Sequence, residues 1–289
     1  MGKLFGESRM MKQSTKRTAH LLVTCCVEET RFEVLKSVVE TLKSEQETKD
    51  IDITPNLWVF DNGSTFPGSK DFIKSNFSKV IQAEKNYGFW SAINWFIKYL
   101  DENFADQYDF LHIIESDHTY FALEKLLTCE AALQKYPSIG SIRLQEFSVA
   151  NAHLYDKDRQ SKDSVSHAWV RQRDWDGTQI TFKLLDEEMR LYESRLVPLL
   201  HSINRLNAMR HAFSFLGVNE RFAEQDFQAA YRTMYPTSGL IDGGIFHTKL
   251  TWKTDTITGS FTPREDLTNV GYRETRHDFI VSIDDMVVQ

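Results

Sequence analysis

The sequence predicts an α/β fold, with a mostly parallel, Rossmann-like sheet flanked by helices. Short apolar runs alternate with stretches of helical periodicity between residues 19 and 147. This alternation is typical of parallel strands joined by right-handed crossover helices. Each of the first four apolar runs also ends in polar residues. Because ligands bind at the carboxyl ends of the strands in such sheets, the same pattern predicts where a functional site lies.

The first half of the chain supplies four strands and three helices. The opening run, "AHLLVTCCV", is continuously apolar, so we expect a strand that is buried on both faces. Trp90, Trp95 and Phe96 fall within the last helix, where aromatic side chains more often fill a core than bind a sugar. In chain order, the strands are expected at 19–27, 55–65, 78–86 and 108–117, and the helices at 31–45, 69–77 and 88–104.

The rest of the chain is expected to be more helical. Residues 186–215 read as one or two helices, with a kink or break at Pro198. The other elements are a helix over 121–136, a strand over 138–147, a helix over 219–235 and a short strand over 238–251. We therefore expect a flexible tail over 1–17, an α/β domain over 18–147, and a region over 148–289 that packs on this domain as one unit.

Composition and charge exclude several classes of protein. The chain has 289 residues and a net charge of −7, which gives no overall basic footprint for nucleic acid. No stretch approaches the roughly 20 apolar residues that cross a bilayer, and the N-terminus lacks the apolar segment of a secretory signal. Three cysteines without metal-type spacing predict buried free thiols in a reducing compartment. We therefore expect a cytoplasmic protein.

The fourth apolar run ends in Glu115-Ser116-Asp117. Alternate residues at a strand end can turn two carboxylates toward one point, where they repel each other unless a cation lies between them. Hard oxygen ligands suit Mg²⁺ or Mn²⁺. The alternative is an acidic turn that caps the helix beginning near Phe121, with Asp117 or Thr119 as the N-cap.

The earlier strand ends also carry candidate ligand contacts. Asp61 ends the second run in "VFDNGST", where its carboxylate can accept a hydrogen bond from a nucleobase; an ordinary Asx turn is the alternative. Lys85 and Asn86 precede a helix, where they can serve a phosphate or a base, or cap that helix. Thr24 and Glu28 follow the first run.

Four segments in order resemble the family 2 glycosyltransferases of the GT-A fold. That family shows a strand ending in Thr, an Asp-x-Gly-Ser turn, an Asn-x-Gly-x-x-x-Ala-x-Asn segment and a strand ending in an Asp-x-Asp type motif. The matching parts here are Thr24, "DNGST", Asn86 through Asn94, and "ESD". Further along, "FLGVNERFAEQDFQAAYR" resembles the stretch that holds the catalytic base, and "GLIDGGIFH" resembles a late strand whose His completes a metal site.

The chain departs from the family pattern at three places. Glu115 stands at the start of the metal motif where the family has Asp, and Asn219 stands where Asp is common. The acidic pair Glu224 and Asp226 is followed by one or two extra residues before Arg232. The register of the catalytic base is therefore open between these two carboxylates.

The resemblance implies an inverting glycosyltransferase that takes a sugar from a nucleotide diphosphate sugar. It implies Asp226 as the first candidate for the base and Glu224 as the second. It also implies Mn²⁺ or Mg²⁺ held by Glu115, Asp117 and His247. Residues expected to bind the nucleotide sugar are Thr24, Glu28, Asp61, Lys85, Asn94 and Ser116. The C-terminal region would then be a helical acceptor-binding region.

The partners and two alternatives stay open at this point. A UDP sugar is the default donor by family habit, and the acceptor is a glycan or another hydroxyl. A modified nucleic-acid base is not favoured, because the net charge is negative. One alternative is a nucleotidyltransferase of related α/β fold, although the Gly-rich basic loop expected after the first strand is missing from "TCCVEETRFE". The other is a non-catalytic protein that binds sugar nucleotides.

Overall fold

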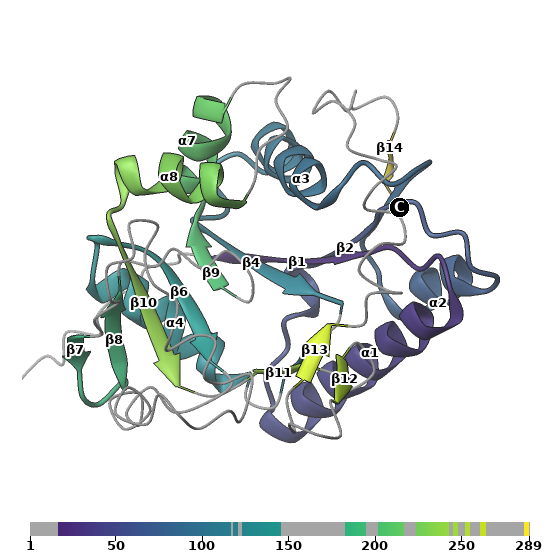
Figure 1. Ribbon diagram of the computed structural model, residues 1–289, viewed down its shortest axis with the longest axis horizontal. Helices are drawn as coiled ribbons and strands as arrows, with labels where there is room; N and C mark the ends of the chain where they lie inside the picture. Colours follow the sequence, from purple (N-terminus) through teal and green to yellow (C-terminus); the bar gives the residue numbers. More distant parts are fainter. Residues whose placement is uncertain are drawn as a thin grey trace, which may run out of the picture.

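A ten-stranded mixed sheet forms the centre of the computed structural model (Figure 1). The structure describes residues 17–116, 118–120, 123–145, 183–194, 202–216, 224–242, 245–247, 252–254, 261–263 and 286–288. Across the sheet, the strands are β14 (Met286–Val288), β3 (Val80–Ala83), β2 (Leu57–Asp61), β1 (Thr18–Thr24), β4 (Phe110–Glu115), β9 (Ser202–Arg205), β6 (Ile139–Gln145), β10 (Thr237–Asp242), β8 (Leu191–Ser194) and β7 (Lys183–Asp186).

Most strands of this sheet point the same way. Strands β1 to β4 are parallel, and β6, β7 and β10 share their direction, whereas β8, β9 and β14 run against them. Strands β1 to β4 are parallel because each crossover helix returns the chain to the same end of the sheet, and their spatial order is β3-β2-β1-β4. The expected mostly parallel α/β sheet flanked by helices is confirmed.

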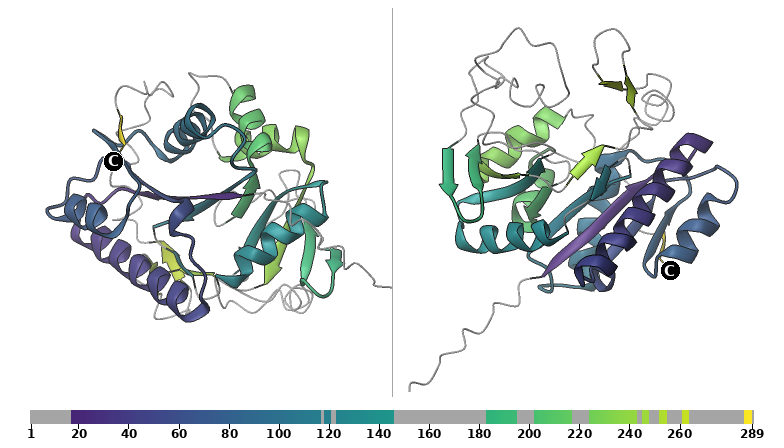
Figure 2. Two further views of the ribbon diagram at one scale, coloured as in Figure 1. Left: turned by 180° about the vertical axis from the view of Figure 1, so that it is seen from behind. Right: turned by 90° about the horizontal axis from the view of Figure 1, so that it is seen from below.

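Helices cover both faces of the sheet (Figure 1, Figure 2). On one face lie α1 (Glu29–Lys49), α2 (Ser69–Asn76) and α4 (Glu124–Lys135), and on the other lie α3 (Phe89–Asn103), α7 (Leu206–Leu216) and α8 (Glu224–Met234). Each helix group buries its own hydrophobic cluster against the strands. All seven residues of β1 are buried, which confirms the prediction of a strand covered on both faces.

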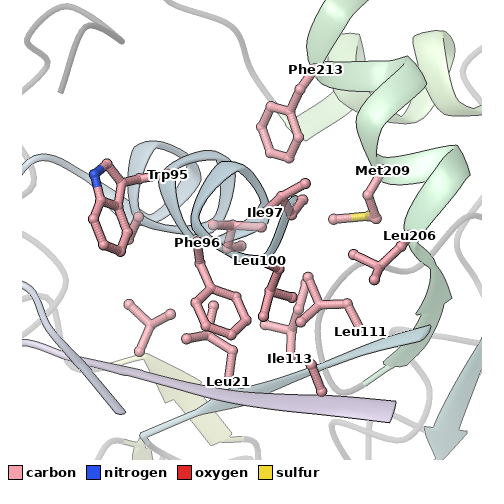
Figure 3. Packing of buried hydrophobic residues seen from close by; sticks show 14 of the residues in the cluster. Leu21, Trp95, Phe96, Ile97, Leu100, Leu111, Ile113, Leu206, Met209 and Phe213 are labelled. Atoms are coloured by element: carbon pink, nitrogen blue, oxygen red, sulfur yellow. The ribbon is translucent and has the colours of Figure 1, made fainter. Parts of the chain in front are cut away.

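The cluster under α3, α7 and α8 is rich in aromatic rings. Figure 3 shows Phe96 and Leu100 of α3 packing toward Leu21 of β1, with Met209 and Phe213 of α7 beside them. Phe96 also contacts Trp58 of β2, with 5.4 Å between ring centroids. The expectation that Trp95 and Phe96 belong to a core is confirmed, since both side chains are buried.

The prediction of one or two helices over 186–215 is wrong for its described residues before Leu206 and is confirmed for those after it. Strands β7 and β8 form a hairpin at its start, β9 follows, and α7 is the helix among the residues of this range that the structure describes. The hairpin turn is local: Arg190 has a φ of 51°, and the Asp186 carboxylate accepts a hydrogen bond from the Met189 N–H. Leu191 then buries its side chain where β8 pairs with β10. Such tertiary pairing overrides local helix propensity. Pro198 lies outside the described residues.

The predicted strand over 238–251 is divided in two. The first part is β10, which joins the main sheet, and the second is β11 (Ile245–His247), which pairs with β5 (His118–Tyr120) in a separate two-stranded sheet. A further small sheet pairs β12 (Trp252–Thr254) with β13 (Phe261–Pro263).

The division of the chain at residue 147 stays a prediction. The main sheet holds strands from both sides of that position, and β9 lies between β4 and β6. Of the predicted N-terminal tail, the structure describes Arg17 alone. Within the described parts of the chain, no helix has the length and apolar character needed to span a bilayer.

Candidate functional site

Three of the predicted site residues end neighbouring strands at one edge of the sheet. The register pairs Thr24 of β1 with Asp61 of β2, and Val23 of β1 with Glu115 of β4. Thr24 and Asp61 are buried. Parallel strands carry their carboxyl ends to a common edge, which is where ligands bind in sheets of this kind. The three residues therefore lie at adjacent strand ends, as the sequence pattern predicted.

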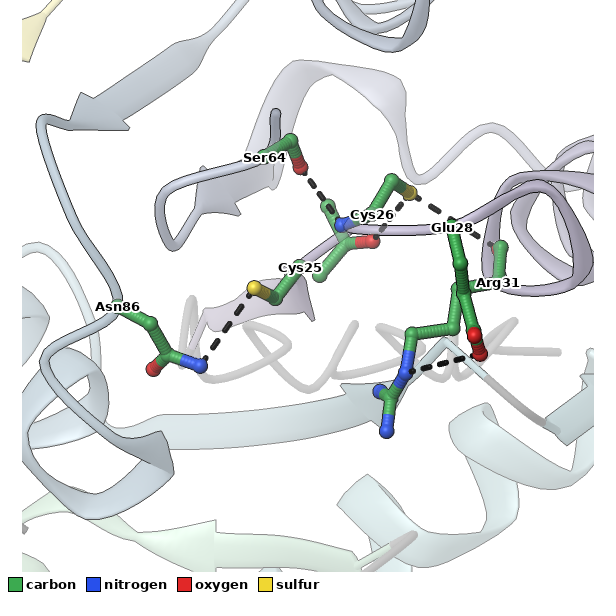
Figure 4. Close-up of polar contacts among 7 residues, drawn as sticks. Cys25, Cys26, Glu28, Arg31, Ser64 and Asn86 are labelled. Atoms are coloured by element: carbon green, nitrogen blue, oxygen red, sulfur yellow. Dashed lines mark hydrogen bonds and ion pairs between the residues drawn. The ribbon is translucent and has the colours of Figure 1, made fainter. Parts of the chain in front are cut away.

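Hydrogen bonds join the loop after β2 to the loop after β1. The Asp61 Oδ1 accepts a hydrogen bond from the Ser64 N–H at 2.9 Å, so the Asx turn considered above is present. The Ser64 Oγ in turn accepts from the Cys26 N–H at 2.8 Å (Figure 4). The Cys26 carbonyl accepts from the N–H groups of Thr65 and Phe66. These bonds hold the two loops together at the carboxyl ends of β1 and β2.

A pair of asparagines joins the loop after β2 to the loop after β3. The Asn62 Nδ2 donates to the Asn86 Oδ1, and the Asn62 Oδ1 accepts from the Tyr87 N–H, both at 2.9 Å. The Asn86 Oδ1 also accepts from the Gly88 N–H, and its Nδ2 lies 3.5 Å from the Cys25 Sγ (Figure 4). Sequence reasoning treated Asn62 only as a turn residue, because nothing in the sequence reveals a contact across 24 positions.

Gly63 allows this close approach. It has a φ of 80°, a conformation that L side chains rarely adopt. A Cβ at this position would lie 2.5 Å from the Asn86 N and 2.8 Å from the Lys85 Cα. The glycine of "DNGST" is therefore required by the neighbouring loop as well as by its own turn.

One oxygen of Asp61 has no donor. Its Oδ2 is buried and has no hydrogen-bond partner in the described part of the structure. An unsatisfied buried acceptor costs on the order of 1–3 kcal/mol, and a donor from a ligand would remove that cost. Because the side chain has 0% exposure, a ligand reaches this oxygen only if the atoms above it move.

Arg31 is a residue of this edge that sequence reasoning missed. It lies in the first turn of α1, and its Nε is 3.9 Å from the Glu28 Oε1 (Figure 4). The signal was available, since Arg31 is the only basic residue in "TCCVEETRFE". Its positive charge lowers the pKa of the nearby Cys25 thiol less than burial raises it.

All three cysteines are free thiols, as predicted, although Cys25 is half-buried rather than buried. Burial raises the pKa of Cys25 to about 11 and also raises the pKa of Cys26. Burial likewise raises the pKa of Cys129. The two thiols at the candidate site are therefore neutral near pH 7, which argues against a nucleophilic role for either one.

The predicted metal ligands come from two segments that the backbone brings together. Glu115 ends β4, and Ser116 follows in a half-buried turn. Antiparallel pairing of β5 with β11 places His247 opposite His118, the residue after Asp117. The side chains of Glu115 and His247, and the whole of Asp117, lie outside what the structure describes. Elsewhere among the described residues, no three His, Cys, Asp or Glu side chains form a metal-type cluster.

The remaining predicted residues lie on helices or loops around this edge. Glu224 and Asp226 belong to the first turn of α8, and their side chains are outside the described set. Lys85 is exposed, with its Nζ 5.2 Å from the Tyr87 ring centroid. Asn94 is half-buried in the second turn of α3.

No protein-family model matches the sequence, and no curated protein matches it. Solved structures with a similar chain arrangement include S. aureus TarS residues 1–349, at 12% identity and a TM-score of 0.45, covering 81% of this chain and 60% of that fragment. A CMP:2-keto-3-deoxy-manno-octonic acid synthetase complexed with CTP matches at 11% identity and a TM-score of 0.43, covering 78% of this chain and 90% of that one. A 4-diphosphocytidyl-2C-methyl-D-erythritol synthase from Anaerococcus prevotii matches at 12% identity and a TM-score of 0.44, covering 80% and 90%. This chain thus spans less than two thirds of the TarS fragment.

Proposed function

We propose that this protein transfers a sugar from a nucleoside diphosphate sugar to an acceptor hydroxyl, with inversion and with the help of a divalent cation. The observation that supports the proposal is the meeting of chemically suited residues at one edge of the sheet. Thr24, Asp61 and Glu115 end neighbouring strands there, and strand pairing brings His247 opposite His118. Carboxylate and imidazole groups of this kind suit Mn²⁺ or Mg²⁺ and the diphosphate that such ions bind.

Asp61 is proposed to read the nucleobase. A carboxylate can only accept hydrogen bonds, so it suits a base with an N–H on its pairing edge, such as uracil or guanine. Cytosine presents an acceptor at the same ring position. The partnerless Oδ2 of Asp61 is the atom available for this contact, and the atoms covering it must move when the base binds. UDP sugars are the default donors. Thr24 and Glu28 are proposed as further contacts to the nucleoside, and Lys85, Asn94 and Ser116 as contacts to the rest of the nucleotide sugar.

The proposed cation ligands are Glu115, Asp117 and His247. Two carboxylates and one imidazole are a donor set that suits Mn²⁺, with Mg²⁺ as the alternative. When bound, the ion neutralises charge on the leaving diphosphate. Glu115, two residues before Asp117, pairs with β1, and His118, the residue after it, pairs with β11.

Asp226 is proposed as the general base, with Glu224 as the alternative. The carboxylate takes the proton of the acceptor hydroxyl while that oxygen bonds to the anomeric carbon. The bond between the anomeric carbon and the diphosphate oxygen breaks, and the nucleoside diphosphate leaves. A single displacement of this kind inverts the anomeric centre, through an oxocarbenium-like transition state. Two residues apart on a helix point about 200° apart, so only one of the two can serve.

The first experiment screens UDP, GDP, dTDP and CMP sugars with released nucleotide as the readout, in Mn²⁺, in Mg²⁺ and in a chelator. Asp117→Asn should lower donor turnover at least about 100-fold, since it removes a cation ligand. Asp71→Asn, a change to an exposed residue of α2, is the matched control. Unchanged, metal-independent turnover in Asp117→Asn would contradict the mechanism. Release of pyrophosphate from a nucleoside triphosphate would indicate nucleotidyl transfer instead.

The second experiment tests the base contact by Asp61→Asn. The asparagine Oδ1 can still accept from the Ser64 N–H, so the turn is retained, whereas its amide group donates where the carboxylate accepted. UDP affinity should fall about tenfold and CDP affinity should rise, because the hydrogen-bond polarity is reversed. Equal losses for both nucleotides would show that Asp61 does not read the base.

A further inference from the structure

Two aromatic rings join the candidate nucleotide loops to the helix that carries the base candidates. Trp90 is the second residue of α3, and Phe227 lies in the first turn of α8. Their rings are stacked, with 4.9 Å between centroids and 21° between planes. Phe227 is buried, and Phe213 of α7 meets its ring edge-on at 4.8 Å. The Phe227 ring is thus held from two helices.

The Trp90 end of this contact is tied to the nucleotide edge. Trp90 follows Gly88, whose N–H is bonded to the Asn86 side chain, and the preceding Tyr87 N–H is bonded to the Asn62 side chain. Phe89 is the single residue between Gly88, whose N–H is bonded in this way, and Trp90. The position of the Trp90 backbone is therefore set by the interlocked loops after β2 and β3.

The Phe227 end is tied to the proposed base. Phe227 directly follows Asp226 and lies three residues after Glu224, so all three residues share the first turn of α8. A helix terminus frays readily unless something holds it. Of the ring contacts within the described residues, the Trp90 stack is the one that reaches this turn from α3.

We infer that Trp90 is a positioning residue that fixes the first turn of α8 relative to the nucleotide loops. The inference rests on the proposed function for its catalytic consequence, because the fixed turn holds Asp226 and Glu224. The placement itself can be tested without any activity. The competing interpretation is simple core packing, in which removal of the ring would weaken the whole protein without a local effect.

Tyr99 provides a matched control on the same helix. Trp90 and Tyr99 are both partly buried against the same hydrophobic cluster. Tyr99 stacks on Trp95 with 5.3 Å between centroids and 9° between planes, and this stack contains no residue of α8. Trp90→Leu and Tyr99→Leu therefore each remove one stacked, half-exposed ring from α3.

Amide hydrogen exchange tests whether Trp90 fixes the first turn of α8. The amides of residues 228–231 bond back to the carbonyls of 224–227 and report on the first turn of α8. In Trp90→Leu these amides should exchange about tenfold faster than in the wild type, whereas in Tyr99→Leu they should stay within about threefold. Trp90→Phe, which keeps a ring, should restore most of the protection. Equal exchange in the two leucine variants would overturn the inference, whatever the activity.

Steady-state kinetics then test the catalytic consequence. In Trp90→Leu, kcat for sugar transfer should fall about tenfold while UDP affinity, measured by calorimetry, stays within about twofold, since the loops themselves are intact. Tyr99→Leu should change neither value by more than about twofold. A kcat in Trp90→Leu equal to that of Tyr99→Leu would overturn the catalytic consequence. If the wild type transfers no sugar from any donor, the proposed function fails, and exchange alone still decides whether Trp90 fixes this turn.

Discussion

The two faces of the sheet are packed with different kinds of side chain. The face under α3, α7 and α8 is filled largely by rings that contact one another, such as the pairs of Trp58 with Phe96 and of Phe60 with Trp95. The face under α1, α2 and α4 is filled mainly by aliphatic side chains and two cysteines. The first face can fix helices through a few specific contacts, whereas the second depends on area and close packing.

The aliphatic face also holds a buried pair of histidines and a buried arginine. His20 of β1 and His112 of β4 lie side by side there, with their Nδ1 atoms 3.0 Å apart and both side chains buried. Arg205 lies over the Phe110 ring and donates to the backbone carbonyls of Leu133, Tyr136 and Ile139. The burial of His20 makes the stability of this face depend on pH, whereas the packing of apolar rings does not.

The largest expected effect comes from truncating a ring on the aromatic face. Phe96→Ala should lower the free energy of unfolding by about 3–5 kcal/mol, because it removes a fully buried ring and leaves a cavity. Leu35→Ala, at a fully buried position on the other face, should cost about 2–5 kcal/mol. Denaturant titration of both variants compares the faces directly. A smaller loss in Phe96→Ala than in Leu35→Ala would contradict the greater specificity assigned to the rings.

The next effect is acid sensitivity of the aliphatic face. Burial lowers the pKa of His20 to about 3, below the value of about 6.5 for an exposed histidine. Below pH 6.5 the unfolded chain therefore binds a proton at His20 that the native state does not bind. The contribution of His20 to the free energy of unfolding is complete above pH 6.5 and is lost as the pH falls toward 3. The loss is up to about 1.4 kcal/mol for each pH unit.

The measurement compares wild type with His20→Gln by denaturant titration between pH 7 and pH 4.5. The wild type should lose more stability on acidification than the variant. Glu130 acts with the opposite sign, because burial raises its pKa, and it is present in both proteins. Parallel pH profiles for the two proteins would show that His20 does not cause the acid sensitivity.

A third effect tests whether the two faces are coupled at the carboxyl edge. The loop after β2 leads to α2 on the aliphatic face, and the loop after β3 leads to α3 on the aromatic face. Gly63→Ala should lower the free energy of unfolding by about 2 kcal/mol, since it places a Cβ against the Asn86 backbone and occupies a left-handed conformation. Ala at Gly68, which has a φ of 79° but open space around it, is the control. Equal losses would mean that backbone strain alone accounts for the loss and that close contact of Gly63 with the neighbouring loop contributes nothing.

Features that depend on a local sequence pattern were predictable, whereas contacts between distant segments were not. β1 was predictable because burial on both faces leaves a continuous apolar run, and the site edge was predictable because each parallel strand ends in polar residues. The Asn62–Asn86 contact was not, since it depends on how two separate loops approach. The β7–β8 hairpin was also missed, because its pairing with β10 is non-local and its residues also suit a helix.

The smallest expected effect concerns the outside of the aromatic face. Arg210 of α7 donates from its Nε to both carboxylate oxygens of Asp101 of α3, at 2.9 and 3.0 Å, and both side chains are exposed. Exposed ion pairs contribute about 0.2–1 kcal/mol, so Asp101→Ala should cost about 0.5 kcal/mol at low salt and less at high salt. Both values come from denaturant titration, with Glu102→Ala, an exposed neighbour, as the control. If ring packing fixes α3 against α7, removing this pair leaves the helices in place. A loss above about 2 kcal/mol would instead mean that the ion pair carries the contact between the helices and that the rings only fill the space beneath it.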